Sequence, residues 1–409
     1  MNIVQINITY NIGSTGRIMK DLDEVIDTSG NHGYMVSAYG ASNSNAMSKL
    51  YSINNSFSNT PAKINLLVSR ITGTMGYRHK RETQDVIKWI ESKKPDIVHL
   101  HNIHGDWINL EILFSFLQRK QIPVVWTLHD CWAFTGRCSH FENCGCDKWK
   151  TGCYQCHNKK IYPVTYYFDR SSKMWADKKK LFTSINNLTI VTPSDWLGKY
   201  VKQSFLANYP VITIHNGIDL STFQPRLTGD KKQKLVGTKK MILGVAGMWT
   251  ERKGLFDFYR LADLLGPDYQ VVLVGLNSRQ MESLPANIIG ISRTNSVIEL
   301  SELYSMADYY VNMTYLDNYP TTNLEAQACG TPTITYRTGG SPESVDADCI
   351  IDQGDVEAVL RIIQQDGKKT LEYYRGKALD NFGADKCFSS YLELYKSVLN
   401  ADNTEGLRC

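Results

Sequence analysis

Two carboxylates and a run of small polar residues stand close together between positions 315 and 332, where the sequence reads YLDNYPTTNLEAQACGTP. Asp317 and Glu325 lie on either side of Thr321, where a helix-like pattern begins. The first turn of a helix presents backbone N–H groups that favour an anion such as a diphosphate, and carboxylates accept hydrogen bonds from sugar hydroxyls. The segment predicts a ligand with an anionic centre and hydroxylated ends, or alternatively a capped surface helix with ordinary acidic residues.

Histidines follow two apolar runs in the first half of the chain. His129 comes directly after a Val-rich run, and His99, His101 and His104 lie in or after an earlier run. Open α/β sheets bind ligands outside the carboxyl ends of their strands. We therefore predict a ligand contact for His129 and for one of the other three, His101, and packing roles for His99 and His104.

A pair of glycines marks the turn that follows the first apolar run. The turn contains Gly13, Ser14, Thr15 and Gly16 and leads into a helical pattern. Glycines let the backbone approach a ligand closely, although ordinary turns use them as well. This short motif is therefore a weak indication of a ligand contact.

Six of the ten cysteines are concentrated in one segment, at Cys131, Cys138, Cys144, Cys146, Cys153 and Cys156. The C-x-x-C spacing of the last two lets two thiolates bind one tetrahedral ion. We predict a structural zinc site formed by Cys138, Cys146, Cys153 and Cys156, with Cys144, His140 or His157 as substitutes. A closed site of four ligands has no open position for water, so this zinc would stabilise a loop. A loop of free thiols is the alternative.

Length and composition limit the classes of protein. The chain has 409 residues, of which 42% are hydrophobic and 21% charged, as in a folded soluble protein too long for one core. The N-terminus lacks the pattern of a secretory signal, and no window approaches the ~18 apolar residues of a membrane span. We expect a cytoplasmic protein with reduced or metal-bound cysteines. The net charge of +4 is too small to indicate nucleic acid as a partner.

Alternating strand-like and helix-like segments indicate two doubly wound α/β domains, each with a parallel sheet. The buried strands are expected at 3–6, 97–100, 124–128, 241–246, 270–275, 309–313 and 332–335. We place the first domain at 1–200, with a Cys-rich insertion at about 131–157, and the second at 201–385. A helix within 386–409 could pack on either domain, and we place it back on the first.

Residues 63–71 mix apolar and basic side chains and are followed by the basic run Arg78-His79-Lys80-Arg81. This pattern is typical of a helix at a membrane surface, and equally of a core helix with a solvated basic end. The membrane interpretation predicts peripheral association with the inner face of the cell membrane.

The chain resembles a known family in several motifs. Segment 315–332 resembles the acidic-x7-Glu motif of retaining glycosyltransferases of the family 4 type (glycosyl transferases group 1). The further matching motifs are Asn216-Gly217-Ile218-Asp219 with Phe223, Lys253-Gly254, Leu324-Glu325-Ala326, Gly330-Thr331-Pro332 and Thr338-Gly339-Gly340-Ser341-Pro342-Glu343. The likeness covers essentially the whole chain and is nearest to capsule and exopolysaccharide enzymes, including those of colanic-acid-like clusters. It implies the GT-B fold, in which two Rossmann-like domains face a central cleft.

The resemblance assigns roles to the residues between Asp317 and Glu325. It implies that Glu325 binds the ribose of a nucleotide sugar and that Asp317 binds hydroxyls of the donor hexose. Thr321, Thr322 and Asn323 would line the diphosphate with backbone and side-chain donors. The family more often has Glu at the first position, and Asp317 keeps the charge on a side chain one methylene shorter.

The resemblance also implies a cationic contribution. Arg252 and Lys253 follow a predicted strand and would neutralise charge on the departing nucleoside diphosphate, whereas without the resemblance they would be ordinary solvated surface. Many relatives carry Arg after the glycine that corresponds to Gly247, where this chain has Met248. Lys253 is the stronger candidate of the two.

In the first domain, the resemblance implies a functional histidine near the reacting carbon, at His129. The expected catalytic residues are His129, Lys253 and Asp317. The expected acceptor-side residues are Gly13, Ser14, Thr15 and His101, with Gly16 near the donor phosphate.

These features predict a retaining, metal-independent hexosyltransferase without a catalytic cofactor. Its donor would be a UDP- or GDP-linked sugar, and its acceptor a saccharide, in the lipid-linked form that surface polysaccharide synthesis uses. A nucleotide-sugar epimerase of the same fold is the alternative enzyme, and it would release an altered sugar nucleotide. A zinc-containing nucleic-acid-binding protein is the non-enzymatic alternative, which the mild net charge disfavours.

Overall fold

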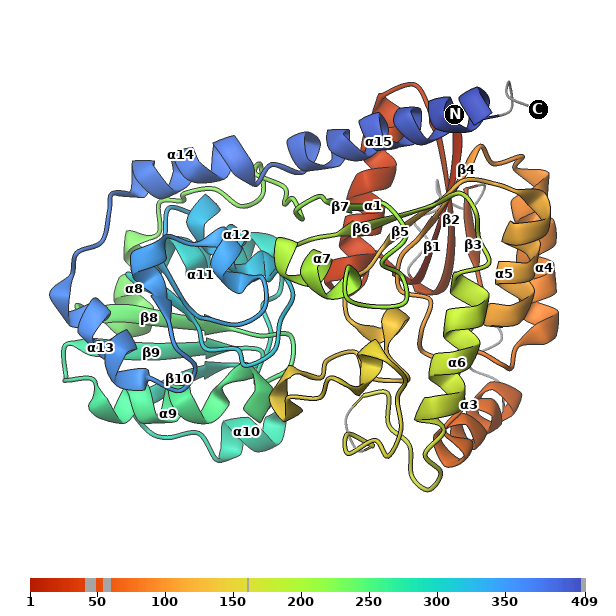
Figure 1. The fold of residues 1–409 in the computed structure, drawn as a ribbon. Coiled ribbons are helices and arrows are strands. Elements are labelled where there is room, and N and C mark those ends of the chain that lie inside the picture. Colours follow the sequence, from red (N-terminus) through yellow and green to blue (C-terminus); the bar gives the residue numbers. More distant parts are fainter. Residues whose placement is uncertain (41–48, 54–59, 160–161, 406–409) are drawn as a thin grey trace. The chain divides into compact units, whose positions relative to one another are not determined.

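The computed structural model describes residues 1–40, 49–53, 60–159 and 162–405 (Figure 1). The chain divides into two compact units. Unit 1 comprises Met1–His215 and Phe388–Cys409, and unit 2 comprises Asn216–Cys387. The predicted boundary at residue 200 falls inside helix α7 (Asp195–Val201), and unit 1 continues through one more strand.

Unit 1 is built on a parallel sheet of seven strands in the order β3-β2-β1-β4-β5-β6-β7. The strands are β1 (Asn2–Tyr10), β2 (His32–Gly40), β3 (Leu50–Ser52), β4 (Ile97–Leu100), β5 (Val124–Thr127), β6 (Leu188–Thr192) and β7 (Val211–Thr213). The helices are α1 (Gly13–Thr28), α3 (Thr60–Thr72), α4 (Lys80–Ser92), α5 (Leu110–Lys120), α6 (Ser171–Phe182), α7 and most of α15 (Ala384–Glu405). The central strands β4, β5 and β6 are buried at every position, which explains why their sequences are mostly apolar.

Unit 2 is a parallel sheet of six strands in the order β10-β9-β8-β11-β12-β13. The strands are β8 (Lys240–Val245), β9 (Tyr269–Val274), β10 (Ile288–Ile291), β11 (Tyr309–Asn312), β12 (Thr333–Tyr336) and β13 (Ile350–Ile351). The helices are α8 (Gly229–Val236), α9 (Leu255–Leu264), α10 (Ser278–Glu282), α11 (Val297–Met306), α12 (Thr321–Ala328), α13 (Val356–Gln365) and α14 (Leu371–Asn381). Helices cover both faces of this sheet, with α11 and α12 on one face and α9 on the other (Figure 1).

Each strand order reverses at one point. The first strand of each unit, β1 or β8, lies between two neighbours whose connections run in opposite directions along the sheet. In such sheets the loops at the carboxyl ends diverge at the reversal and leave space for a ligand. The loops after β8 and β11 in unit 2, and after β1 and β4 in unit 1, are therefore the positions at which a site is expected.

Helix α15 crosses the unit boundary, and its tyrosines bond to the sheet of unit 1. The Tyr395 hydroxyl lies 2.7 Å from Nδ1 of His99, and the Tyr391 hydroxyl lies 3.0 Å from Oγ1 of Thr127. The same Thr127 oxygen lies 2.8 Å from Nε2 of His99. Burial lowers the pKa of His99 to about 3, so this ring is a neutral part of the core and packs as predicted.

Helix α1 carries a buried carboxyl group, Asp23, which is 7% exposed. Within the described part of the chain, its Oδ1 atom has no hydrogen-bond partner. Burial and the nearby charge of Asp27 raise the pKa of Asp23 to about 7, against a lowering by Lys49. The folded protein therefore holds this proton more tightly than the unfolded chain does.

Replacing Asp23 by Asn should change how stability depends on pH. Between pH 3.8 and about 7 the folded state binds the proton that the unfolded state has lost, so the stability contribution of Asp23 falls as the pH rises. We expect Asp23→Asn to raise the free energy of unfolding at pH 8 by on the order of 2 kcal/mol and to change little at pH 4. Urea unfolding of both proteins between pH 4 and pH 8 measures this difference in the free energy of unfolding.

The matched control is Glu24→Gln, which alters a carboxylate that is 64% exposed on the same helix. It should change the pH slope of the wild type far less than Asp23→Asn does, because Glu24 makes only one of the smaller contributions to the raised pKa of Asp23. Identical slopes for wild type and Asp23→Asn between pH 4 and 7 would contradict the assignment.

Candidate functional site

The loops after β8 and β11 bring together two residues of the predicted site in unit 2. Lys253 Nζ lies 2.5 Å from Oδ2 of Asp317, and each of these side chains is 23% exposed. The two loops follow adjacent strands at the reversal of strand order. An ammonium group and a carboxylate thus meet at the edge of the sheet where a ligand is expected.

Two hydrogen bonds hold these two loops together, one between backbone groups and one from a side chain to the backbone. The N–H of Tyr315 donates to the carbonyl of Arg252 over 2.8 Å, and Nη1 of Arg252 donates to the carbonyl of Leu316 over 2.8 Å. Arg252 therefore orients the loop that carries Asp317. Its predicted contact with a donor molecule stays a prediction.

Glycines permit the close approach of these loops. Gly254 has a φ of +75°, and a Cβ atom there would lie 2.2 Å from the carbonyl oxygen of Met313. Gly339 has a φ of +54°, and a Cβ atom would lie 1.8 Å from the carbonyl oxygen of Asp317. Both motif glycines are thus required by backbone conformation and by the backbone that they contact.

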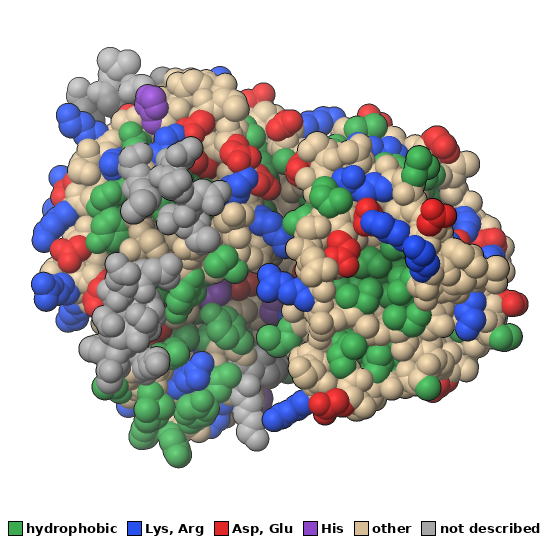
Figure 2. Space-filling view, turned by 180° about the vertical axis from the view of Figure 1, so that it is seen from behind, with side chains coloured by type: hydrophobic (Ala, Val, Ile, Leu, Met, Phe, Trp, Pro, Cys, Tyr) green, Lys and Arg blue, Asp and Glu red, His purple; other side chains and the backbone are tan. Residues whose placement is uncertain are grey.

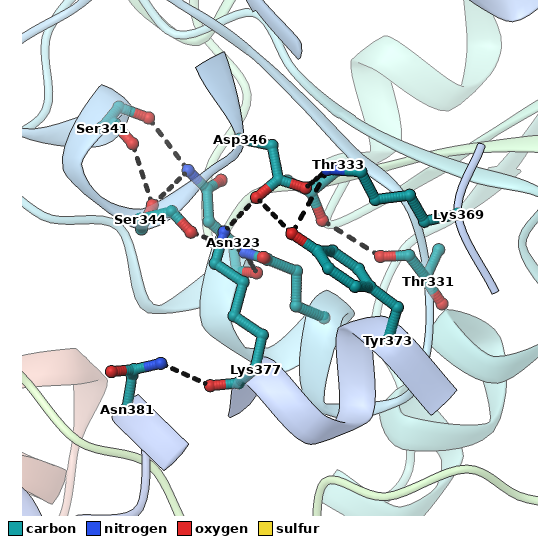
Figure 3. Close-up of polar contacts among 11 residues, drawn as sticks. Asn323, Thr331, Thr333, Ser341, Ser344, Asp346, Lys369, Tyr373, Lys377 and Asn381 are labelled. Atoms are coloured by element: carbon teal, nitrogen blue, oxygen red, sulfur yellow. Dashed lines mark hydrogen bonds and ion pairs between the residues drawn. The ribbon is translucent and has the colours of Figure 1, made fainter. Parts of the chain in front are cut away.

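Helix α12 starts in this region, and its first residues differ in what they can do. Thr321 and Thr322 are half-buried at the helix start, where backbone N–H groups are available to an anion. Asn323 is fully buried; its Oδ1 accepts from Asn312 over 2.8 Å. Its Nδ2 donates to the hydroxyls of Ser341 and Ser344 over 3.0 and 3.1 Å (Figure 3).

The contacts of the Asn323 side chain give no support to its predicted role in lining a diphosphate, which stays a prediction. Both ends of its amide are bonded within the protein, and Figure 3 shows it pointing toward the turn that carries Ser341 and Ser344. Its side chain joins α12 to this turn, whose glycine contacts the backbone of Asp317. Asn323 thereby positions the loop that carries Asp317.

Glu325 is on the buried side of α12 and is 5% exposed. The hydroxyl of Tyr304, on α11, donates to its Oε2 over 2.9 Å. Burial, together with the charge of Glu325, raises the pKa of Tyr304 well above its usual value, so the hydroxyl remains a donor. The Tyr304 bond fixes the direction of the carboxylate.

Unit 1 places a group of histidines at the carboxyl ends of β4 and β5. Nδ1 of His101 lies 3.1 Å from Nε2 of His129, and Nε2 of His101 lies 3.1 Å from Oε1 of Gln5. His101 is 1% exposed, so the geometry gives no support to its predicted contact with an acceptor. His129 is partly exposed, and burial lowers its pKa to about 4 despite the opposing charge of Asp130.

Asp130 is paired with a second histidine of the same loops. Nε2 of His104 lies 3.1 Å from Oδ2 of Asp130, and Nδ1 of His104 lies 3.0 Å from the hydroxyl of Tyr162. Burial would raise the pKa of Asp130, but His104 and the N–H of Trp132 hold it at about 2. His104 thus contacts the Asp130 carboxylate in addition to its packing role.

The predicted glycine turn forms the first turn of α1, which begins at Gly13. Gly13 and Ser14 are exposed and Thr15 is half-buried, so they are accessible as the prediction requires. Gly16 is buried, and a Cβ atom there would lie 2.9 Å from Oγ1 of Thr9. Packing within unit 1 accounts for Gly16 without a ligand.

The Cys-rich segment between β5 and α6 does not support the zinc prediction. In the described ranges, no three or more His, Cys, Asp or Glu residues are grouped so that they could hold a metal ion. The four predicted ligands were Cys138, Cys146, Cys153 and Cys156. Sγ of Cys138 lies 4.0 Å from Sγ of Cys156, and Cys153 instead accepts the backbone N–H of Gly136 over 3.0 Å.

Aromatic packing and buried hydrogen bonds hold this segment instead. The Trp149 ring centroid lies 5.3 Å from that of Phe134 and 5.0 Å from that of Phe141. Lys178 of α6 donates to the carbonyls of Trp132 and Thr135 over 2.6 and 3.1 Å. These contacts give the segment a core of its own without a metal.

Helix α3 presents apolar side chains outward. Ile64 and Leu67 are each 52% exposed, and the adjacent segment exposes Tyr167 and Phe168 by 71% and 55%. Figure 2 shows hydrophobic side chains gathered at the lower left edge of the molecule. None of the described helices is long and apolar enough to cross a membrane.

Two polar residues that the sequence did not single out belong to these sites. Gln5 is fully buried in the apolar strand β1, and Tyr304 is fully buried in α11. A polar residue inside a buried strand must find a partner, so Gln5 carried a readable signal. Tyr304 carried none, because tyrosines in helices are commonly packing residues.

Two family models match the chain, one in each half. The model described as Glycosyltransferase Family 4 matches residues 67–222. The model described as Glycosyl transferases group 1 matches residues 228–366, which contain Lys253, Asp317 and Glu325.

Curated proteins of this kind are similar to the chain. WcaC of Escherichia coli (strain K12), a glycosyl transferase assigned by name to colanic acid biosynthesis, is 25% identical over 356 residues, 84% of this chain and 85% of that protein. A D-inositol 3-phosphate glycosyltransferase of Corynebacterium jeikeium (strain K411) is 32% identical over 151 residues, 32% of this chain and 36% of that protein.

Solved structures share the fold over nearly the whole chain. A sucrose-phosphate synthase from Thermosynechococcus elongatus matches with a TM-score of 0.69 at 15% identity, covering 98% of this chain and 99% of that one. Anabaena Alr3699/HepE in complex with UDP matches with a TM-score of 0.67 at 12% identity, covering 97% of this chain and 100% of that one. At such identities the likeness concerns the fold.

Substitution of Gly339 tests the close approach of the loops. We expect Gly339→Ala to lower the free energy of unfolding by about 1–3 kcal/mol, because Ala is strained at this φ and its Cβ meets the Asp317 carbonyl. The control is Gly376→Ala in α14, where no atom lies within 4 Å of the added Cβ. It should stabilise by up to ~1 kcal/mol. Denaturant unfolding of both variants measures this, and equal effects would refute the steric explanation.

Proposed function

Since this chain belongs to the GT-B glycosyltransferases of the group 1 and family 4 type, we propose that it transfers a hexose from a nucleotide sugar to a saccharide with retention of configuration. The observation that carries this proposal is the meeting of Lys253, Asp317 and the start of α12 on the loops after β8 and β11. A cation, a carboxylate and free helix N–H groups match a diphosphate joined to a sugar.

Each group has a distinct role in the proposed complex. Glu325, directed by Tyr304, accepts hydrogen bonds from the ribose hydroxyls. Backbone N–H groups at Thr321 and Thr322 bind the diphosphate. Asp317 accepts hydrogen bonds from the donor hexose, and Lys253 neutralises the diphosphate as it leaves.

Binding of a donor would exchange the Lys253–Asp317 pair for contacts with the ligand. The ammonium and the carboxylate neutralise each other across 2.5 Å. A nucleotide sugar offers the ammonium a diphosphate and offers the carboxylate hydroxyl donors. Binding thus exchanges one ion pair for two sets of charge-assisted hydrogen bonds, which require both ends of the donor.

The proposed reaction needs no nucleophile from the protein. The bond between the anomeric carbon and the diphosphate oxygen breaks through an oxocarbenium-like state. The acceptor hydroxyl forms the new bond on the same face, and its proton passes to the leaving diphosphate oxygen. The protein aligns the acceptor and stabilises the leaving group, and Lys253 with the helix start supplies positive charge without a divalent ion.

We propose UDP- or GDP-sugars as donors and a lipid-linked saccharide of surface polysaccharide synthesis as the acceptor. The similarity to a protein named for colanic acid biosynthesis supports the acceptor class. The shared fold with a protein crystallised with UDP and UDP-glucose supports a uridine donor. A lipid-linked acceptor also gives the exposed apolar residues of α3 a use at the membrane surface.

A donor panel tests the function together with the role of Lys253. We expect the wild type to turn over one class among UDP-, GDP- and ADP-sugars, in the presence of EDTA as well. Lys253→Ala should lower kcat/KM about 100-fold or more, because a charge that stabilises the leaving group is lost. Its effect on unfolding should stay within about 1 kcal/mol, since the pair is partly exposed.

Lys232→Ala is the matched control. Lys232 pairs with Asp308 across 2.6 Å at similar exposure, but just before β11, at the opposite end of the strand. It should leave turnover unchanged. Near-normal turnover by Lys253→Ala would remove Lys253 from the mechanism, and release of an altered sugar nucleotide without acceptor would establish an epimerase instead.

Liposome flotation tests the proposed membrane contact. The wild type should float with vesicles containing anionic lipid, and Leu67→Glu should float several-fold less, because a charge replaces an apolar contact in the lipid interface. The control Leu379→Glu changes a residue of α14 with a similar exposure of 54% and should bind as the wild type does. Equal flotation of both variants would place the contact elsewhere, and no flotation of the wild type would refute it.

A further inference from the structure

The histidine group of unit 1 contains a directional chain of hydrogen bonds that begins in strand β1. The side-chain amide of Gln5 has one identified partner at each end. Its Nε2 donates to the carbonyl of Met19 over 3.2 Å, and its Oε1 lies 3.1 Å from Nε2 of His101. A carbonyl of the backbone can only accept, so the amide orientation is determined and Oε1 faces His101.

The orientation of Gln5 determines the protonation of His101. Because Oε1 is an acceptor, Nε2 of His101 must carry the hydrogen. Burial lowers the pKa of His101 well below its usual value, and the neighbouring histidines lower it further. The ring is therefore neutral, and its Nδ1 atom carries a lone pair.

His101 in turn determines the protonation of His129. Nε2 of His129 lies 3.1 Å from the Nδ1 lone pair of His101, so it must be the donor. The rings are held for this contact, since their planes lie within 16° with centroids 5.4 Å apart. The indole of Trp126 donates to the backbone carbonyl of His101 over 3.0 Å and fixes the chain there.

We propose that Gln5 and His101 are positioning residues that hold His129 in the tautomer with the proton on Nε2 and the lone pair on Nδ1. The proposal deepens the proposed function and rests on it, because it gives His129, which is partly exposed at the end of this series of hydrogen bonds, a defined hydrogen-bonding character.

The tautomers can be measured without any substrate. Two-bond 1H–15N correlation spectra of histidine-labelled protein separate protonated from unprotonated ring nitrogens. The His129 signals are assigned by their loss in His129→Asn. At pH 7 we expect the wild type to show His129 as a single species protonated at Nε2.

Two variants break the chain of hydrogen bonds at different points. Gln5→Met removes the acceptor for His101, and His101→Phe removes the acceptor for His129. Each should give His129 a second population, about one-tenth or more, protonated at Nδ1, and each should lower sugar transfer at least about tenfold. Two variants keep the test usable if one of them fails to fold, which thermal unfolding reveals.

Thr127→Val is the control within the same buried cluster. It removes a contact of His99 and of Tyr391 but none of Gln5, His101 or His129, so the His129 tautomer should not change. A wild-type His129 protonated at Nδ1, or an unchanged tautomer in both folded variants, would overturn the proposal. If the tautomers respond as expected but no nucleotide sugar is turned over, the hydrogen-bond chain stands and the proposed function fails.

Discussion

The contact between Lys253 and Asp317 depends on how closely two loops of unit 2 approach each other. Opposite charges at 2.5 Å require the loops after β8 and β11 to lie against one another, and side chains at Gly254 or Gly339 would prevent this. The parallel sheet also brings the two loops together, because β8 and β11 are adjacent strands and both loops follow their carboxyl ends at the same edge of the sheet. The buried network of Asn323 then ties the following helix to the same backbone.

In both units, hydrogen bonds from fully buried polar side chains orient a side chain of the predicted site. In unit 2 the Tyr304 hydroxyl directs Glu325, and in unit 1 Gln5 and His101 direct His129. A buried donor or acceptor without a partner costs about 1–3 kcal/mol, so each of these groups strongly favours one arrangement. The sites are thereby organised before any ligand arrives.

The sequence predicted the central strands well, for a physical reason. Strands buried on both faces are mostly apolar, and β4 and β8 are so apart from His99 and Lys240. The short edge strands β7 (Val211–Thr213) and β13 (Ile350–Ile351) are only partly buried or exposed and left little signal. The predicted domain boundary at residue 200 lies before β7, because this short strand left too little signal to be recognised as part of the first domain.

Side-chain roles were harder to predict, because their partners are distant in the sequence. Asn323 looked like a ligand donor, and only the fold brings Asn312 and Ser344 to it. The cysteine spacing indicated zinc, yet spacing does not fix where the sulfur atoms point. The pairing of Lys253 with Asp317 joins residues that the sequence singled out separately.

The discontinuity of unit 1 has a consequence for biosynthesis. Residues 388–405 belong to unit 1 but are made after all of unit 2. All of unit 2 is therefore synthesised while His99 and Thr127 still lack their hydrogen bonds to Tyr395 and Tyr391. Domains generally fold as units during synthesis, and the N-terminal domain folds first. Unit 1 cannot be completed in this order, because the surface of its sheet that binds α15 stays exposed until this last helix has been synthesised.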